Sequence, residues 1–240
     1  MEAKQEGRFS SPAAVLVVYL AWMLITALIP QLNRVFDFNA VNPYILPGLR
    51  MLLLFLVTAL FIRFSERKPV TYGFNLNLQR LGRNVFYAVV FFLVTTVVVW
   101  AYQRFVVVPL THAEVTASSE ELPEALGSFA ERLMSYLYVL FEGMVEVLTF
   151  IGFMLDRLAR KWGWAWALLL SNLGFALWHY DYLRAGWLQG SLMMALTFLA
   201  GITISFSYLK TRNSLSPVIC HTLVDAPSEL GALLGLRIMF

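Results

Sequence analysis

Residues 133–155 have the sequence LMSYLYVLFEGMVEVLTFIGFML, an apolar run interrupted by two glutamates. As a helix, such a run can cross a hydrocarbon core of about 30 Å, which takes roughly 20 residues. Its apolar residues are continuous and do not alternate with polar ones, so a helix is favoured over a strand of a membrane barrel. This stretch therefore predicts an all-α protein embedded in a membrane.

The composition of the whole chain supports the same class. Hydrophobic residues make up 59% of the 240 residues and charged residues only 14%, whereas soluble domains carry about 25% charge. The expected surroundings are therefore a lipid bilayer. There is no tract rich in Lys and Arg, so no nucleic-acid partner is expected. The single cysteine, Cys220, cannot form an intramolecular disulfide.

Six further apolar segments resemble the first in length, and together they define the predicted architecture. The segments are residues 13–30, 44–62, 84–108, 133–155, 164–180, 187–209 and 215–236. They predict a polytopic transmembrane helical bundle of about seven spans, with an intramembrane polar cavity, in a single domain covering residues 1–240. The last segment carries two prolines and three ionisable residues, which sets it apart from the others.

The basic residues predict an orientation. Twelve of the 18 lie at the N-terminus and in alternate connections: Lys4, Arg8, Arg63, Arg67, Lys68, Arg80, Arg83, Arg157, Arg160, Lys161, Lys210 and Arg212. Cytoplasmic segments of membrane proteins carry such an excess. The N-terminus is therefore predicted to be cytoplasmic and, with seven spans, the C-terminus to lie outside.

Two glutamates occupy one face of the fourth segment. Glu142 and Glu146 are four residues apart, so a helix brings them to the same side. An ionisable residue at the membrane centre costs about 2.5–3.5 kcal/mol on insertion scales, and is by default a candidate for function. Two buried carboxylates so close together cannot both carry charge at low cost. The pair is a candidate source of a general acid or base.

Histidines in the later segments add to this set. His179 ends the fifth segment, two turns from Asn172 on the same face. In the last segment, His221 and Asp225 form an i,i+4 pair. A glutamate and a histidine can activate water, while a second histidine with Asp or Asn can stabilise an oxyanion. The same residue types could also bind zinc or relay protons in a transporter, and spacing alone leaves these three alternatives open.

Three of these segments resemble the signature motifs of the CPBP family of intramembrane endopeptidases, which includes the type II CAAX prenyl proteases and the bacteriocin self-immunity proteins. The family shows Glu-Glu-x-x-x-Arg-Gly, then Phe-x-x-x-His, then His-x-x-x-Asn/Asp on successive helices. Here Phe175 precedes His179 by four residues, and His221 precedes Asp225 by four. In the first motif, Glu146 and Gly152 match. The motif-bearing core covers about residues 133–229.

The resemblance implies a peptidase that uses no metal cofactor, although zinc stays an open alternative. It implies that Glu146 and His179 activate the water that attacks a peptide carbonyl, and that His221 and Asp225 stabilise the oxyanion. Val147 and Ile151 stand where the family has its second Glu and its Arg. Either this is a divergent active branch in which Glu142 supplies the missing carboxylate, or the protein is an inactive member that binds a peptide or partner. We favour the active branch, because the four positions that handle water and the oxyanion all match.

The resemblance also implies a substrate class and a location. The substrate would be a membrane protein or a lipidated, membrane-anchored peptide. With a cytoplasmic N-terminus, Glu146 and His179 would lie toward the outer half of the membrane. Some bacterial branches of the family are associated with C-terminal protein sorting, so the expected location is a prokaryotic plasma membrane and the expected reaction a sorting or processing cleavage.

Overall fold

The computed structural model describes residues 12–36, 45–111 and 129–234, and within them every regular element is a helix. The predicted all-α class is confirmed for these residues. The elements are α1 (Pro12–Phe36), α3 (Ile45–Ser65), α4 (Val70–Gly73), α5 (Leu81–Tyr102), the π-helix η1 (Gln103–Val107), α6 (Val108–Thr111), α7 (Phe129–Val147), the π-helix η2 (Leu148–Leu155), α8 (Asp156–Trp178), the 3-10 helix η3 (Tyr180–Ala185), α9 (Trp187–Thr211) and α10 (Leu215–Leu234).

Five helical stretches in this part of the chain are long and apolar enough to cross a membrane, which makes the protein an integral membrane protein. They are Pro12–Ile29, Leu46–Phe64, Leu81–Thr111, Leu133–Trp178 and Trp187–Thr211. The expected number was about seven. The number of stretches differs because the fourth and fifth predicted segments are the two arms of one continuous apolar stretch that turns at Gly163, and because the last helix is apolar only over the shorter run Leu215–Asp225.

The long stretch Leu133–Trp178 folds back on itself at Gly163. This residue has φ 79° and ψ 168° inside α8, a conformation that glycine adopts without the steric cost of a Cβ. Contacts on the two sides of the turn are antiparallel: the Phe150 and Phe175 rings lie 5.3 Å apart, and Trp178 bonds Glu146. The stretch is therefore a helical hairpin that brings the end of α8 beside the end of α7.

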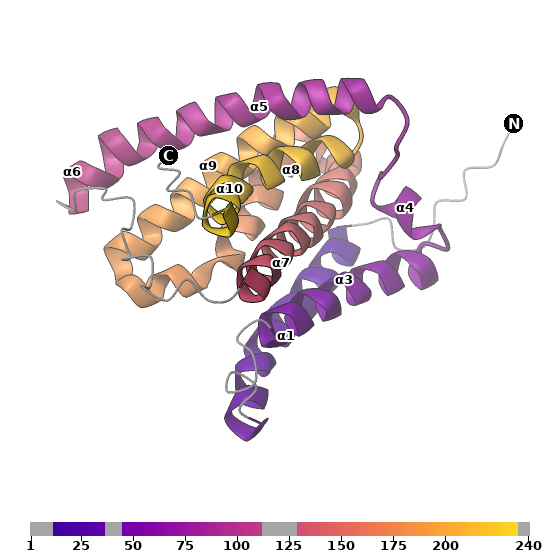
Figure 1. Cartoon of the computed structure of the whole chain (residues 1–240). Coiled ribbons are helices and arrows are strands. Elements are labelled where there is room, and N and C mark those ends of the chain that lie inside the picture. Colours follow the sequence, from indigo (N-terminus) through magenta and orange to yellow (C-terminus); the bar gives the residue numbers. More distant parts are fainter. Residues whose placement is uncertain (1–11, 37–44, 112–128, 235–240) are drawn as a thin grey trace, which may run out of the picture.

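The hairpin lies at the centre of the bundle (Figure 1). Helices α9 and α10 pack beside it, and α5 runs along one edge against both of them. On the other side α1 packs on α8 and α3 on α7. The sequence of α1 explains why one of its faces packs on the bundle. Its leucines recur every four residues on an exposed face, while the residues of another face are buried. The exposed set is Leu16, Leu20, Leu24 and Leu28, and the buried set is Val18, Trp22, Thr26 and Ile29.

The π-helix η2 begins directly after Val147, and all eight of its residues are buried. Its wider turns leave carbonyl oxygens that accept side-chain hydrogen bonds: Phe150 O from the Ser171 hydroxyl, and Gly152 O from Asn75 Nδ2 at 3.3 Å. A Cβ at position 152 would lie 2.6 Å from the Phe74 carbonyl oxygen, so glycine permits this close approach. Because π-helices are frequent at functional sites, η2 indicates that the functional site lies in this part of the hairpin.

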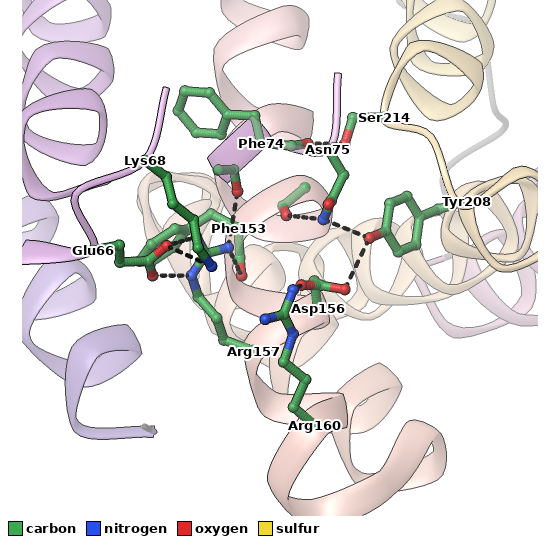
Figure 2. A network of polar contacts seen from close by, with 12 residues as sticks. Glu66, Lys68, Phe74, Asn75, Phe153, Asp156, Arg157, Arg160, Tyr208 and Ser214 are labelled. Carbon is green, nitrogen blue, oxygen red and sulfur yellow. Dashed lines mark hydrogen bonds and ion pairs between the residues drawn. The ribbon is translucent and has the colours of Figure 1, made fainter. Parts of the chain in front are cut away.

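Arg157 anchors the end of the bundle near Gly163 (Figure 2). Its Nε and Nη2 each donate to a carboxylate oxygen of Glu66 at 2.6 Å, and its Nη1 donates to the carbonyls of Gly73 at 2.9 Å and Phe153 at 3.1 Å. Both charged side chains are almost fully buried. Arg157 was expected in a cytoplasmic loop. It lies inside the structure instead, because the hairpin continues as a helix through these residues and the segment after α3 folds over it.

The three connections predicted to share one side of the membrane meet at this end. Asn75 Nδ2 donates to the Tyr208 hydroxyl at 2.8 Å, and that hydroxyl donates to Asp156 Oδ1 at 3.2 Å (Figure 2). The Asn213 side chain makes two hydrogen bonds to the backbone of Asn77: Oδ1 accepts from the Asn77 N–H at 3.1 Å, and Nδ2 donates to the Asn77 carbonyl oxygen. The connections after α3, within the hairpin and after α9 are therefore held together at one end of the bundle. Which side of the membrane this end faces stays a prediction.

Candidate active site

Glu146 lies at the opposite end of the hairpin from Gly163, one residue before the end of α7, and its side chain is buried. Three ring nitrogens face its carboxylate. Trp178 Nε1 donates to Oε1 at 2.9 Å, His179 Nε2 lies 3.8 Å from Oε1, and His221 Nε2 lies 3.6 Å from Oε2. Two of these groups come from the end of α8 and one from α10. The fold thus surrounds one carboxylate with groups from two other helices.

His179 is oriented by the end of its own helix. It caps α8 with φ −89° and ψ 29°, and its Nδ1 lies 2.9 Å from the Phe175 carbonyl oxygen. In the neutral tautomer that donates from Nδ1 to this carbonyl, Nε2 keeps its lone pair and faces Glu146. The ring is also held edge-on against Phe175, with centroids 4.9 Å apart. The spacing of four residues between Phe175 and His179 produces both contacts.

His221 and Asp225 lie one helical turn apart on α10. His221 Nδ1 is 2.6 Å from Asp225 Oδ2, and the opposite ring nitrogen faces Glu146. A carboxylate on one imidazole nitrogen fixes the tautomer and the direction of the other nitrogen. Asp225 is therefore placed to orient His221 and lies on its far side from Glu146. The four residues predicted from the motifs are brought together, whereas their catalytic roles stay a proposal.

A small hollow lies beside Glu146, with room for about one water molecule. It is lined by Glu146, Val147, Phe150, Ile151, Phe175, Gly201, Ile204 and His221. The predicted intramembrane polar cavity is absent from the described residues, because apolar side chains of η2, α8 and α9 fill the space around the carboxylate. The two residues that depart from the family motif, Val147 and Ile151, contribute to this apolar lining.

Glu142 does not share the environment of Glu146. Its Oε1 accepts a hydrogen bond from the Tyr138 hydroxyl at 2.8 Å and lies 3.5 Å from Arg50 Nη2. The side chain is 27% exposed, whereas Glu146 is 3% exposed. The two carboxylates follow one another along α7, as their spacing predicts, but they have separate partners. Glu142 is thus the outer and Glu146 the inner member of the pair.

Asn172, the other predicted auxiliary residue, faces α9. Its Nδ2 donates to the Leu168 carbonyl at 2.8 Å and lies 3.2 Å from the Ser205 hydroxyl, which returns a hydrogen bond to Asn172 Oδ1 at 3.3 Å. These are polar contacts between two packed helices, and they do not reach Glu146. Asn172 shares a helix face with His179, but seven residues place it too far along the axis to join the site.

Two residues of the site, Trp178 and Arg50, lie outside the motifs that predicted the others. Trp178 donates a hydrogen bond to Glu146 at 2.9 Å, yet a tryptophan in an apolar segment is not distinctive. Arg50 is different, because it is the one basic residue within the predicted span 44–62. The insertion cost that drew attention to the glutamates applies equally to an arginine and would have identified it.

The zinc alternative receives no support from the grouping of side chains. In the described ranges, no set of three or more His, Cys, Asp or Glu residues is arranged so that it could hold a metal ion. Asp225 contacts the far nitrogen of His221, so it does not add a ligand on the side of Glu146. The hollow beside Glu146 and His221 has room for a water molecule close to a carboxylate and an imidazole.

Comparison with known proteins gives one match. Residues 128–227 match the family model described as type II CAAX prenyl endopeptidase Rce1-like. The match contains all four motif residues and the hairpin, and it leaves α1, α3 and α5 outside. No curated protein and no solved structure matches the chain.

Proposed function

We propose that this chain, whose residues 128–227 match the family model described as type II CAAX prenyl endopeptidase Rce1-like, is an intramembrane endopeptidase. The substrate class is a membrane-anchored protein or peptide, the class on which proteases of this family act. One observation carries the proposal most strongly. Three ring nitrogens converge on one buried carboxylate beside a hollow that has room for about one water molecule.

The geometry supports a water-activated mechanism. A water held beside Glu146 and His179 gives a proton to the Glu146 carboxylate while its oxygen bonds the carbonyl carbon of the substrate. The carbonyl oxygen becomes an oxyanion, to which His221 donates from Nε2 in its doubly protonated form. The carbon–nitrogen bond then breaks, and the proton passes from Glu146 to the leaving amine. Asp225 acts by orienting His221.

A second candidate function is that of an inactive family member that binds a peptide or protein partner in the membrane. The observation that favours it is the apolar lining that Val147 and Ile151 give to the hollow, since a charged pair is expected there in the family. Both candidates share the membrane location and differ only in turnover.

Cleavage by the purified protein distinguishes the two. We expect the protein in lipid vesicles to cleave a peptide anchored by a lipid or a single apolar helix, with the new terminus identified by mass spectrometry. The cleavage should persist in the presence of EDTA and disappear in His179→Ala. If the wild-type protein cleaves no member of a library of anchored peptides, the binding function is the better one. Loss of cleavage with EDTA, restored by zinc, would contradict the metal-free mechanism.

Asp225→Asn is expected to be a mild variant. The side-chain amide oxygen can still accept from His221 Nδ1, so the ring stays oriented, and the loss of kcat should remain below about 10-fold, less than a general base contributes. Asp225→Leu has no acceptor and should lose more. The comparison is made by kcat and KM on one anchored peptide. Equal losses in the two variants would show that Asp225 does more than orient His221.

We also propose that the site opens toward the outer face of the membrane. Glu146 lies at the end of the hairpin away from the joined basic connections, which are expected to be cytoplasmic. A reporter fused after Phe240 should therefore be active only outside the cytoplasm. Activity of the fusion in the cytosol would reverse the orientation. In that case prenylated cytosolic tails, and not exported proteins with C-terminal sorting segments, would be the accessible substrates.

A further inference from the structure

Arg50 is the residue that the proposed mechanism leaves without a role. It lies on α3, outside the residues that match the family, and its side chain is 22% exposed. Its guanidinium turns toward the hairpin, where Nη2 lies 3.5 Å from Glu142 Oε1. An arginine in an apolar helix is costly to insert and is retained where a buried partner or function needs it.

The same guanidinium also contacts Trp178. The Arg50 Cζ atom lies 5.3 Å from the centroid of the Trp178 ring, within the range of a cation–π interaction. On α1, the Trp22 ring lies 5.1 Å from the Trp178 ring. Trp22 is itself fixed, because its Nε1 lies 3.1 Å from the Leu54 carbonyl oxygen and 3.0 Å from the Thr58 hydroxyl. Residues of α1 and α3 thus hold the indole that donates to Glu146.

The charge of Arg50 also stabilises the two glutamates of α7. Glu142 and Glu146 occupy one face of α7, one turn apart, and repel one another when both are ionised. In the part of the chain that the structure describes, Arg50 is the cation that contacts the outer carboxylate, Glu142. It therefore favours a charged Glu142 and, through the ring of Trp178, a fixed position of Glu146.

We propose that Arg50 is a positioning residue for Glu146, acting through Trp178 and Glu142, so that the N-terminal helices complete the site. Only the activity test of this inference rests on the proposed function. The site carried by residues 128–227 would then depend on α1 and α3, which lie outside the family match.

The first test measures the Trp178 hydrogen bond itself. In protein labelled with 15N at its seven tryptophans, the Trp178 indole N–H resonance is identified by its loss in Trp178→Phe. It should move in Glu146→Gln and in Arg50→Gln, and less in Arg50→Lys, which keeps the charge. Arg63→Gln is the control, because Arg63 is an exposed arginine of the same helix. A Trp178 resonance that stays at its wild-type position in Arg50→Gln would overturn the proposal.

The second test measures catalysis. Small displacements of a catalytic group cost up to about 100-fold, so kcat should fall by about 10- to 100-fold in Arg50→Gln with KM changed by less than about 2-fold. Arg50→Lys should recover part of the loss. The Arg50→Gln/Glu142→Gln double variant should be no less active than Arg50→Gln, because it leaves no unpaired carboxylate at position 142.

Two outcomes separate this inference from the function on which the activity test rests. If Arg50→Gln changes KM alone, Arg50 binds substrate and the positioning role is wrong. If the wild-type protein cleaves no anchored peptide, the proposed function fails, while the indole resonance still decides whether Arg50 positions Trp178. Should Arg50→Gln not fold, Arg50→Lys and Trp22→Phe give the same resonance test, and an unmoved resonance in both would overturn the proposal.

Discussion

Replacing Glu146 with glutamine should reduce peptide cleavage by about 100- to 10,000-fold, the contribution of a positioned general base. Glutamine keeps the volume of the side chain, and its amide oxygen can still accept the hydrogen bond that Trp178 Nε1 makes at 2.9 Å. It cannot take a proton from water. The fold should therefore be retained and the loss should lie in kcat, measured with an anchored peptide in lipid vesicles. His179→Ala should be similarly severe.

Glu142→Gln is the matched control for this experiment, because the same substitution is made one turn away on the same helix. Its carboxylate contacts Tyr138 and Arg50 and makes no contact with the hollow. Its loss of activity should therefore be smaller than that of Glu146→Gln. A larger loss would make Glu142 the base. Cleavage by Glu146→Gln at the wild-type rate would contradict the mechanism and would mean that another group takes the proton from water.

Replacing Arg157 with methionine should destabilise the protein by about 3–5 kcal/mol, the usual cost of breaking a buried ion pair by removing one partner. The guanidinium makes two charged hydrogen bonds to Glu66 and two to backbone carbonyls (Figure 2). Without it, the cation that remains beside the buried Glu66 carboxylate among the described residues is Lys68, at 3.9 Å. Denaturant titration of the protein in detergent measures the change in the free energy of unfolding.

Two companion variants show whether the effect comes from the unpaired charge. Arg160→Met removes an arginine three residues away that pairs with Asp156. Because the Arg160 side chain is 52% exposed, its loss should lower the free energy of unfolding by less than about 1 kcal/mol. Glu66→Met combined with Arg157→Met removes both charges and should be more stable than Arg157→Met alone. If the double variant is the less stable of the two, the network stabilises through packing and not through charge pairing.

The sequence alone determined the class of the protein and predicted four side chains that the fold brings together: Glu146, His179, His221 and Asp225. Long apolar runs determine transmembrane helices, because lipid offers the backbone no hydrogen-bonding partners. Spacing within one helix determines which residues share a face, so the contacts of His179 with Phe175 and of His221 with Asp225 follow from intervals of four residues. The ordered motifs then indicated the family whose model matches residues 128–227.

Only the tertiary structure decided which helix faces meet. Periodicity does not say what lies opposite a face, so it could not reveal that Arg50 contacts Glu142, that Trp178 bonds Glu146, or that Arg157 is buried against Glu66. The sequence also led us to expect an intramembrane polar cavity, whereas apolar side chains leave a hollow for about one water molecule. The π-helix adds a physical reason, because its wider turns rotate the residues after Val147 away from the faces that a regular helix would predict.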